Sequence, residues 1–223
     1  MLNPTTQTYT SLTAAYDYFN RELFASNLSP CLITMQRHKG AYGYFSGERF
    51  ANTTDPQEVT DEIALNPIHF ATREPIEVLA TLAHEMVHLW QHHHGKPPRK
   101  GYHDKQWAVK IHGIGLTPTA TGEKGAKETG QNMTHLIEEH GRFAQAAIKL
   151  LAEQPAILYA DRSSDNDQIR KKKAASKTKY TCSSCGLNAW AKPEVLLVCG
   201  TCQELMQAEN IEEKINNFTF PVR

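Results

Sequence analysis

Apolar residues recur with helical spacing between residues 79 and 90. They fall at i, i+3 and i+4 positions, so that they share one side of an α-helix. The stripe consists of Leu79, Leu82, Ala83, Met86, Val87 and Trp90. Pro75 suits the first turn of such a helix, and Gly95 suits its end. The pattern therefore predicts a helix with one face packed in the core.

Similar patterns predict the surrounding elements. A helix is expected at 12–24, strands at 32–36, 41–46 and 62–65, and a further helix at 134–152. The buried side of this last helix would consist of Leu136, Phe143, Ala147, Ile148 and Leu151. Helices and short strands in one chain, without internal repeats, indicate an α+β fold.

A short motif, His84-Glu85-Met86-Val87-His88, lies inside the first of these patterns. Residues four apart share a helix face, so His84 and His88 can direct ring nitrogens at one metal ion. Zinc lowers the pKa of a bound water from about 15.7 to about 7, and Glu85 is placed to take its proton. The motif predicts a zinc-dependent peptidase with Glu85 as general base. The adjacent apolar stripe favours this interpretation over a surface helix with two unrelated histidines.

A catalytic zinc of this type needs a third protein ligand and one open position. His94 stands at the spacing of the metzincin motif, but Gln91 replaces the glycine that lets the chain turn there. We therefore expect residues 92–94 to continue the last helical turn as a solvated helix end. His103 is the other candidate, and we favour it.

His103 follows a loop with two prolines that can fold the chain back toward the metal. Asp104 can cap a second helix that ends near Gly113. The apolar residues of this helix are Trp107, Ala108 and Ile111. His103 would then lie just before the helix and face the zinc ion.

These features resemble the SprT-like family of metallopeptidases, which includes the Spartan DNA–protein crosslink proteases. The resemblance covers most of the chain. It rests on residues 12–24, Ala41-Tyr42-Gly43-Tyr44-Phe45, Ile63-Ala64-Leu65-Asn66-Pro67, the helix 79–90, Tyr102-His103-Asp104 with Trp107, Ile114-Gly115-Leu116, and 135–151 with Gly141 and Phe143. It implies a zincin-like domain, with His84, His88 and His103 as zinc ligands and Glu85 as the catalytic residue.

Four cysteines near the C-terminus form two C-x-x-C pairs, Cys182 with Cys185 and Cys199 with Cys202. This is the spacing of a zinc ribbon, in which four thiolates close a structural site. Such a site contributes on the order of 10 kcal/mol to folding. Disulfides are the alternative, but they need an oxidising compartment, and residues 1–10 do not resemble a secretory signal. Cys31 is expected to be a small buried residue at a strand start.

Length and composition fit two parts. The chain has 223 residues, of which 40% are hydrophobic, and a formal net charge of zero. We expect a metallopeptidase domain at 1–160, a basic linker at 161–179, a ribbon at 180–206 and a tail at 207–223. No stretch is long enough to span a membrane, and we expect a cytoplasmic protein that can associate with DNA or the nucleoid.

Residues 170–179 carry only positive charge. Such a run suits salt-sensitive phosphate contacts, although a solvated linker would look the same. In the ribbon, Trp190, Tyr180 and Lys192 could contact an unpaired base, but packing around the metal is the role that we favour for Trp190. The resemblance to Spartan implies DNA-crosslinked proteins as substrates and DNA, including single strands, as a partner.

The chain is thus predicted to be a zinc-dependent endopeptidase that acts on DNA-associated proteins, with one catalytic and one structural zinc. An extended substrate is expected to pair with an open sheet edge at the strand 62–65. Tyr44, Tyr102, His112 or none of them would stabilise the oxyanion. The alternative is a DNA-associated zinc protein without peptidase activity. It predicts the same two zinc ions, so metal content does not separate the two hypotheses. Gln91 disfavours a secreted metzincin-like protease.

Overall fold

The computed structural model describes residues 3–153, 157, 159–162 and 177–208. The chain divides into two compact units, 1–162 and 163–223, which are described separately. Residues 163–176, with most of the expected linker, and residues 209–223 of the expected tail lie outside the described residues. No helix in the described parts of the chain has the length and apolar character that crossing a membrane requires.

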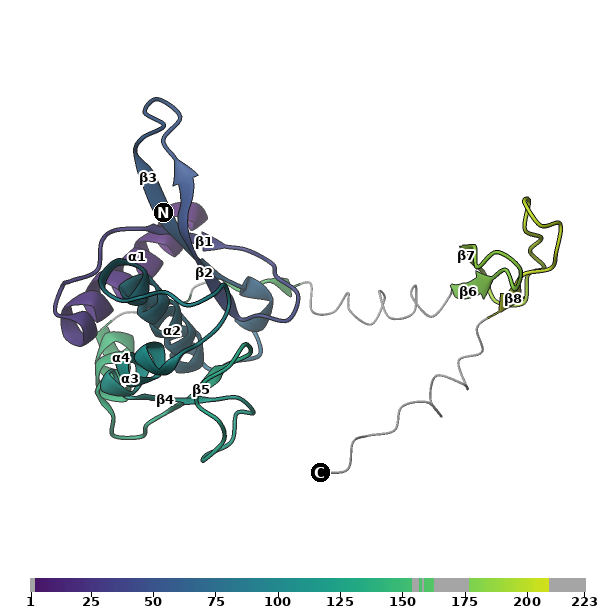
Figure 1. Ribbon diagram of the computed structural model, residues 1–223. Helices are drawn as coiled ribbons and strands as arrows, with labels where there is room; N and C mark the ends of the chain where they lie inside the picture. The colour runs from purple at the N-terminus through teal and green to yellow at the C-terminus, as the bar shows by residue number, and fades with distance from the viewer. Residues whose placement is uncertain (1–2, 154–156, 158, 163–176, 209–223) are drawn as a thin grey trace. The chain divides into compact units, whose positions relative to one another are not determined.

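The first unit combines four α-helices with two small sheets (Figure 1). Its elements are α1 (Pro4–Phe24), β1 (Leu32–Met35), β2 (Gly43–Ala51), β3 (Val59–Leu65), the short 3-10 helix η1 (Pro67–His69), α2 (Pro75–His94), α3 (Lys105–Gly113), β4 (Leu116–Thr119), β5 (Thr134–Ile137) and α4 (Arg142–Glu153). The α+β class predicted from the sequence is confirmed.

Helix α2 lies at the centre of the hydrophobic core. Five of its six stripe residues are at most 1% exposed, and Trp90 packs partly buried against them. Each fully buried aliphatic side chain contributes about 1.5–3 kcal/mol relative to an exposed one. Pro75 begins the helix, and Gly95 caps its end, as the sequence predicts. Burial on several sides therefore fixes the position of α2.

The main sheet has the order β1-β3-β2. Strand β3 pairs with β1 in parallel and with β2 in antiparallel orientation. The expectation that a substrate pairs with the strand at 62–65 is therefore wrong, because β3 is the central strand and both its edges are occupied. Strands β1 and β2 are the edge strands instead. Cys31, just before β1, is half-buried against the core, and burial raises its pKa to about 12.

The expected helix at 134–152 is two elements. Residues 134–137 form β5, which pairs with β4 in an antiparallel hairpin, and the helix begins only at Arg142. Gly141 lies in the turn between the two elements, where a Cβ atom would lie 2.8 Å from Cβ of Glu138 and 3.1 Å from the Cα atom of Gly115. Ile148, expected on the buried side, is 61% exposed. Leu136 lies in β5 and not in the helix. Phe143 and Ala147 are fully buried as predicted, and Leu151 packs partly buried against the core.

The described part of the second unit is a small sheet with the order β7-β6-β8. Its strands are β6 (Thr178–Thr181), β7 (Asn188–Ala191) and β8 (Gln207–Ala208). Tyr180 is buried beside the cysteines, and its hydroxyl donates to the Lys192 carbonyl at 2.9 Å. Trp190 is 63% exposed. The expectation that Trp190 packs around the metal is therefore wrong, and Tyr180 takes that place.

We predict that Gly115→Ala destabilises the first unit by about 1–3 kcal/mol. Gly115 has a φ of +89°, and a Cβ atom there would lie 2.7 Å from the backbone nitrogen of Arg142. Gly113→Ala is the control, because a Cβ atom at Gly113 meets nothing within 4 Å. Urea denaturation measures both changes. Equal stability of the two variants would contradict the tight junction between β4 and α4.

Candidate metal centres

Three imidazole rings converge in the first unit. His84 and His88 extend from α2, and His103 lies two residues before α3. Nε2 of His103 is 3.3 Å from Nε2 of His84 and 3.0 Å from Nε2 of His88. Ligands at 2.0–2.1 Å from a tetrahedral zinc ion are separated by about 3.3 Å. The structure thus brings the three sequence-predicted histidines together at spacings that fit one zinc ion.

Trp107 holds the three rings in place. It is fully buried on α3, and its ring centroid lies 4.8 Å from that of His84, 5.3 Å from that of His88 and 4.3 Å from that of His103. The backbone N–H of Trp107 donates to the side chain of Asp104 at 2.9 Å, which is the predicted helix cap. One aromatic side chain therefore contacts two histidines of α2 and a third from the segment just before α3.

Gln91, which stands where a metzincin has glycine, links the same two helices. It is buried, and its Nε2 donates to Asp104 Oδ1 at 2.9 Å. Asp104 is the neighbour of His103, so this bond ties the third histidine to α2. His94 points elsewhere, because its Nε2 lies 2.9 Å from the Asn27 carbonyl oxygen. The structure places His103, and not His94, in the cluster.

Burial keeps the imidazoles neutral. It lowers the pKa of His88 to about 3 and the pKa of His84 well below its ordinary value. Neutral rings offer a lone pair to a metal ion, whereas protonated rings do not. Nδ1 of His103 lies 3.2 Å from the Gly130 carbonyl oxygen. This contact orients the ring so that Nε2 faces the cluster.

His135 is a fourth histidine at the site, and the sequence did not single it out. Its Nδ1 lies 3.1 Å from Nδ1 of His84. A ligand that binds metal through Nε2 carries its proton on Nδ1, so His84 can donate to His135 and be oriented by it. His135 lies on β5, in the hairpin that was expected to be a helix, and no spacing rule connects it with the motif on α2.

Glu85 is buried beside the histidines, and this burial raises its pKa to about 8. Strand β2 passes close to it. A Cβ atom at Gly43 would lie 2.8 Å from the Ala64 carbonyl oxygen and 3.4 Å from Cγ of Glu85. Glycine at this position therefore lets β2 pack closely against β3, next to Glu85.

The histidines and Glu85 face a cleft of about 900 Å³. Strand β2 forms part of its wall, and segments 97–103 and 131–135 form others. Tyr44 and Tyr102 line this cleft together with His135. His112 is not one of the lining residues, and its Nε2 lies 3.1 Å from the Glu128 carboxylate instead. The cluster thus has an open side large enough for an extended peptide.

The comparison with known families agrees with this geometry. The model of the SprT-like family matches residues 12–129, just over half of the chain. The chain belongs to the SprT-like family. The matched region contains all three clustered histidines and Glu85, so the first unit is a metallopeptidase-type domain.

A curated relative of this SprT-like protein is similar over a short stretch. The "Uncharacterized protein in mucB 3'region" of Salmonella typhimurium is 58% identical over 36 residues, which cover 16% of this chain and 49% of that protein. The chain thus spans about half the length of the curated relative that it matches.

The second unit of the SprT-like protein holds a four-cysteine cluster. The ligand atoms of Cys182, Cys185, Cys199 and Cys202 all lie within 4.8 Å of one another. None of the five cysteines of the chain is in a disulfide. Backbone N–H groups of Cys202 and Thr201 lower the pKa of Cys199 to about 7, which favours its thiolate. Four cysteines at this spacing can close a tetrahedral zinc site, as in the predicted ribbon.

We predict that His135→Ala lowers the affinity of the histidine cluster for a divalent metal by about 10- to 100-fold, because His84 loses the partner of its Nδ1. Cobalt titration followed by visible absorption reports this site, since cobalt on thiolates has separate sulfur bands. His140→Ala is the control, because His140 is exposed in the turn after β5. Unchanged cobalt affinity in His135→Ala would contradict the orienting role.

Proposed function

We propose that this SprT-like protein is a zinc-dependent endopeptidase, in which His84, His88 and His103 hold the catalytic zinc. The observation that carries the proposal is the convergence of three neutral imidazoles beside a buried carboxylate on an open cleft. Zinc bound there would supply Lewis-acid chemistry, which acidifies water and polarises a carbonyl group. The four cysteines would hold a second, structural zinc.

Glu85 is the proposed general base. Its carboxylate lies one residue from His84, on the cleft and outside the ligand set. It takes a proton from the attacking water and passes it to the amine that leaves when the peptide bond breaks. Burial alone raises its pKa, and a nearby cation favours the ionised form that a base requires.

Strand β2 is the proposed binding edge for the substrate. Its residues Tyr44, Phe45, Ser46 and Gly47 line the cleft, and within the described chain no strand pairs with its outer edge. An extended peptide can add to such an edge through main-chain hydrogen bonds, which accept many sequences. Tyr44 and Tyr102 are the proposed donors to the oxyanion, since both hydroxyl-bearing side chains line the cleft.

We predict that Glu85→Gln lowers peptide cleavage by about 10²- to 10⁴-fold, while zinc content and the far-UV circular dichroism spectrum stay unchanged. The glutamine is nearly isosteric but cannot accept the proton. Casein-type cleavage assays and elemental analysis of the same preparation measure both properties. Cleavage that survives the substitution would remove Glu85 from the mechanism. A zinc-loaded wild-type protein without any cleavage would instead favour a DNA-associated binding protein.

We also propose that the substrates are DNA-bound proteins and that the ribbon contacts DNA. Trp190 is 63% exposed on β7, and its cross-strand partner on β6 is Lys179. Directly paired residues share one face of a sheet. An exposed indole beside an ammonium group suits stacking on an unpaired base with a neighbouring phosphate contact. The positively charged residues 170–173 that precede these strands in the sequence lie outside the described part of the chain.

We predict that Trp190→Ala weakens binding of single-stranded DNA by about 1–3 kcal/mol, which is roughly 5- to 150-fold in Kd. Trp190→Phe should retain most of the affinity, because phenylalanine can still stack. Leu196→Ala is the matched control, because Leu196 is also exposed in the second unit. Fluorescence anisotropy of a labelled oligonucleotide measures the change. Equal affinity in all three variants would exclude stacking on Trp190.

Cleavage of a DNA-binding protein with and without single-stranded DNA separates the two proposals. Cleavage that needs both Glu85 and DNA supports a DNA-activated peptidase. DNA-independent cleavage keeps the peptidase and removes the DNA-linked substrate class.

A further inference from the structure

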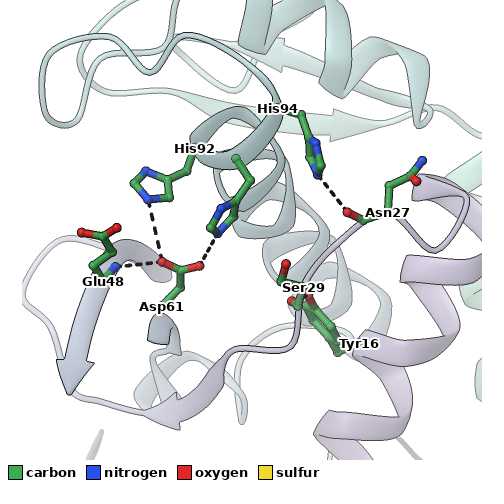
Figure 2. A network of polar contacts seen from close by, with 8 residues as sticks. Tyr16, Asn27, Ser29, Glu48, Asp61, His92 and His94 are labelled. Atoms are coloured by element: carbon green, nitrogen blue, oxygen red, sulfur yellow. Dashed lines mark hydrogen bonds and ion pairs between the residues drawn. The ribbon is translucent and has the colours of Figure 1, made fainter. Parts of the chain in front are cut away.

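A third cluster of metal-binding side chains lies at the C-terminal end of α2. It consists of Asp61, His92 and His93, whose ligand atoms all lie within 4.8 Å of one another. Nε2 of His93 is 2.6 Å from Asp61 Oδ2, and Nε2 of His92 is 3.9 Å from Asp61 Oδ1. Figure 2 shows His92 directed at Asp61 from the end of the helix. Residues 92–94 were expected to form a solvated helix end, but His92 and His93 face the buried carboxylate of Asp61.

A bulge in β2 holds the carboxylate in place. Ser46 pairs with Glu62 and Phe50 pairs with Thr60, so three residues of β2 lie opposite Asp61 alone. The middle one, Glu48, has a φ of +48°, and its backbone N–H donates to Asp61 Oδ1 at 2.8 Å. Asp61 is only 5% exposed. A buried carboxylate needs compensating partners, and here the backbone of the bulge supplies one.

The same bulge holds the His92 ring. A Cβ atom at Gly47 would lie 2.6–3.0 Å from three ring atoms of His92, so only glycine lets the ring lie against the strand. The Phe45 ring is also near, with its centroid 5.6 Å from that of His92. Both the ring and the carboxylate are thus fixed by packing and by backbone contacts.

We propose that Asp61, His92 and His93 bind a divalent late first-row transition metal ion, with zinc as the biological candidate. Two imidazole nitrogens and one carboxylate oxygen are a ligand set that such ions accept. Around a tetrahedral zinc, ligand atoms are about 3.3 Å apart. The contact of His93 with Oδ2 of Asp61 is shorter than this value, and the contact of His92 with Oδ1 is longer. A metal ion binds Nε2 of His93 through its lone pair, so the ion would take the place of the present His93–Asp61 contact.

This centre is separate from the histidine cluster of the proposed active site. His88 and His92 are four residues apart on the same face of α2, which corresponds to about 6 Å along the axis. The two groups have no ligand in common. Asp61 lies on β3, so an ion bound here would tie the end of α2 to β3 beside the bulge of β2. Gly47 of this bulge and His92 both line the cleft.

His94 provides a matched control within the same helical turn. Its ring turns away from Asp61 and contacts the Asn27 carbonyl oxygen instead (Figure 2). Replacing His94 therefore removes an imidazole from the helix end without removing a ligand of the cluster. Asp61→Asn is a second test, because its side-chain oxygen can still accept from the Glu48 N–H while the anionic ligand is lost.

The experiment is equilibrium dialysis of the full-length protein against increasing free zinc, with bound zinc measured by elemental analysis. All proteins carry Glu85→Gln, which prevents self-cleavage. The background protein and His94→Ala should bind one equivalent more than His93→Ala and Asp61→Asn. Added zinc should raise the Tm of the first two proteins more than that of the others, because an ion that binds only the folded state stabilises it.

The comparison does not depend on the peptidase proposal, since only the difference of one equivalent between matched variants is scored. Equal zinc content in all four proteins would overturn the third centre and leave the His93–Asp61 contact as a helix-end hydrogen bond. Loss of the extra equivalent in His94→Ala as well would also overturn it, because the ion would then bind to the histidine run and not to Asp61.

Discussion

Burial of α2 is the constraint on which the rest of the structure depends. The helix packs against α1, α3, α4 and both sheets, and its apolar stripe is almost completely shielded from solvent. The polar residues of the helix must therefore be placed where a partner or the cleft can receive them. His84, His88 and Glu85 meet this condition together, because each is costly to bury in its charged form. A metal ion at the three imidazoles would offset that cost for the carboxylate beside them.

The features that were predicted correctly from the sequence depend on the spacing of residues within a few positions. The limits of α2 and the cap of α3 follow from Pro75, Gly95 and Asp104, whose effects reach only one turn of helix. The choice of His103 over His94 followed from Gln91, because a missing glycine is also a local signal. The two cysteine pairs are again a matter of spacing within a few residues, and the structure brings all four thiols together.

Features that depend on contacts between distant segments were missed. His135 reaches His84 only because β4 and β5 form a hairpin, and the apolar residues of β5 fit a helical pattern equally well. The central place of β3 depends on its pairing with β1 and β2 at once. Trp190 was expected to pack around the metal of the ribbon, but Tyr180 packs beside the cysteines instead. In each case two patterns were locally compatible, and tertiary packing decided between them.

Strand β2 shows how one element can serve two sites. Its first half is regular, and Gly43 packs closely against β3 next to Glu85. Its register then shifts, and the bulge turns Gly47 and the Glu48 N–H toward the end of α2. Histidines 84, 88 and 92 lie four residues apart along a single helix face, yet they belong to two groups. The rings belong to different groups because they contact different segments. His84 and His88 contact His103 and Trp107. His92 contacts the bulge of β2 and Asp61 instead.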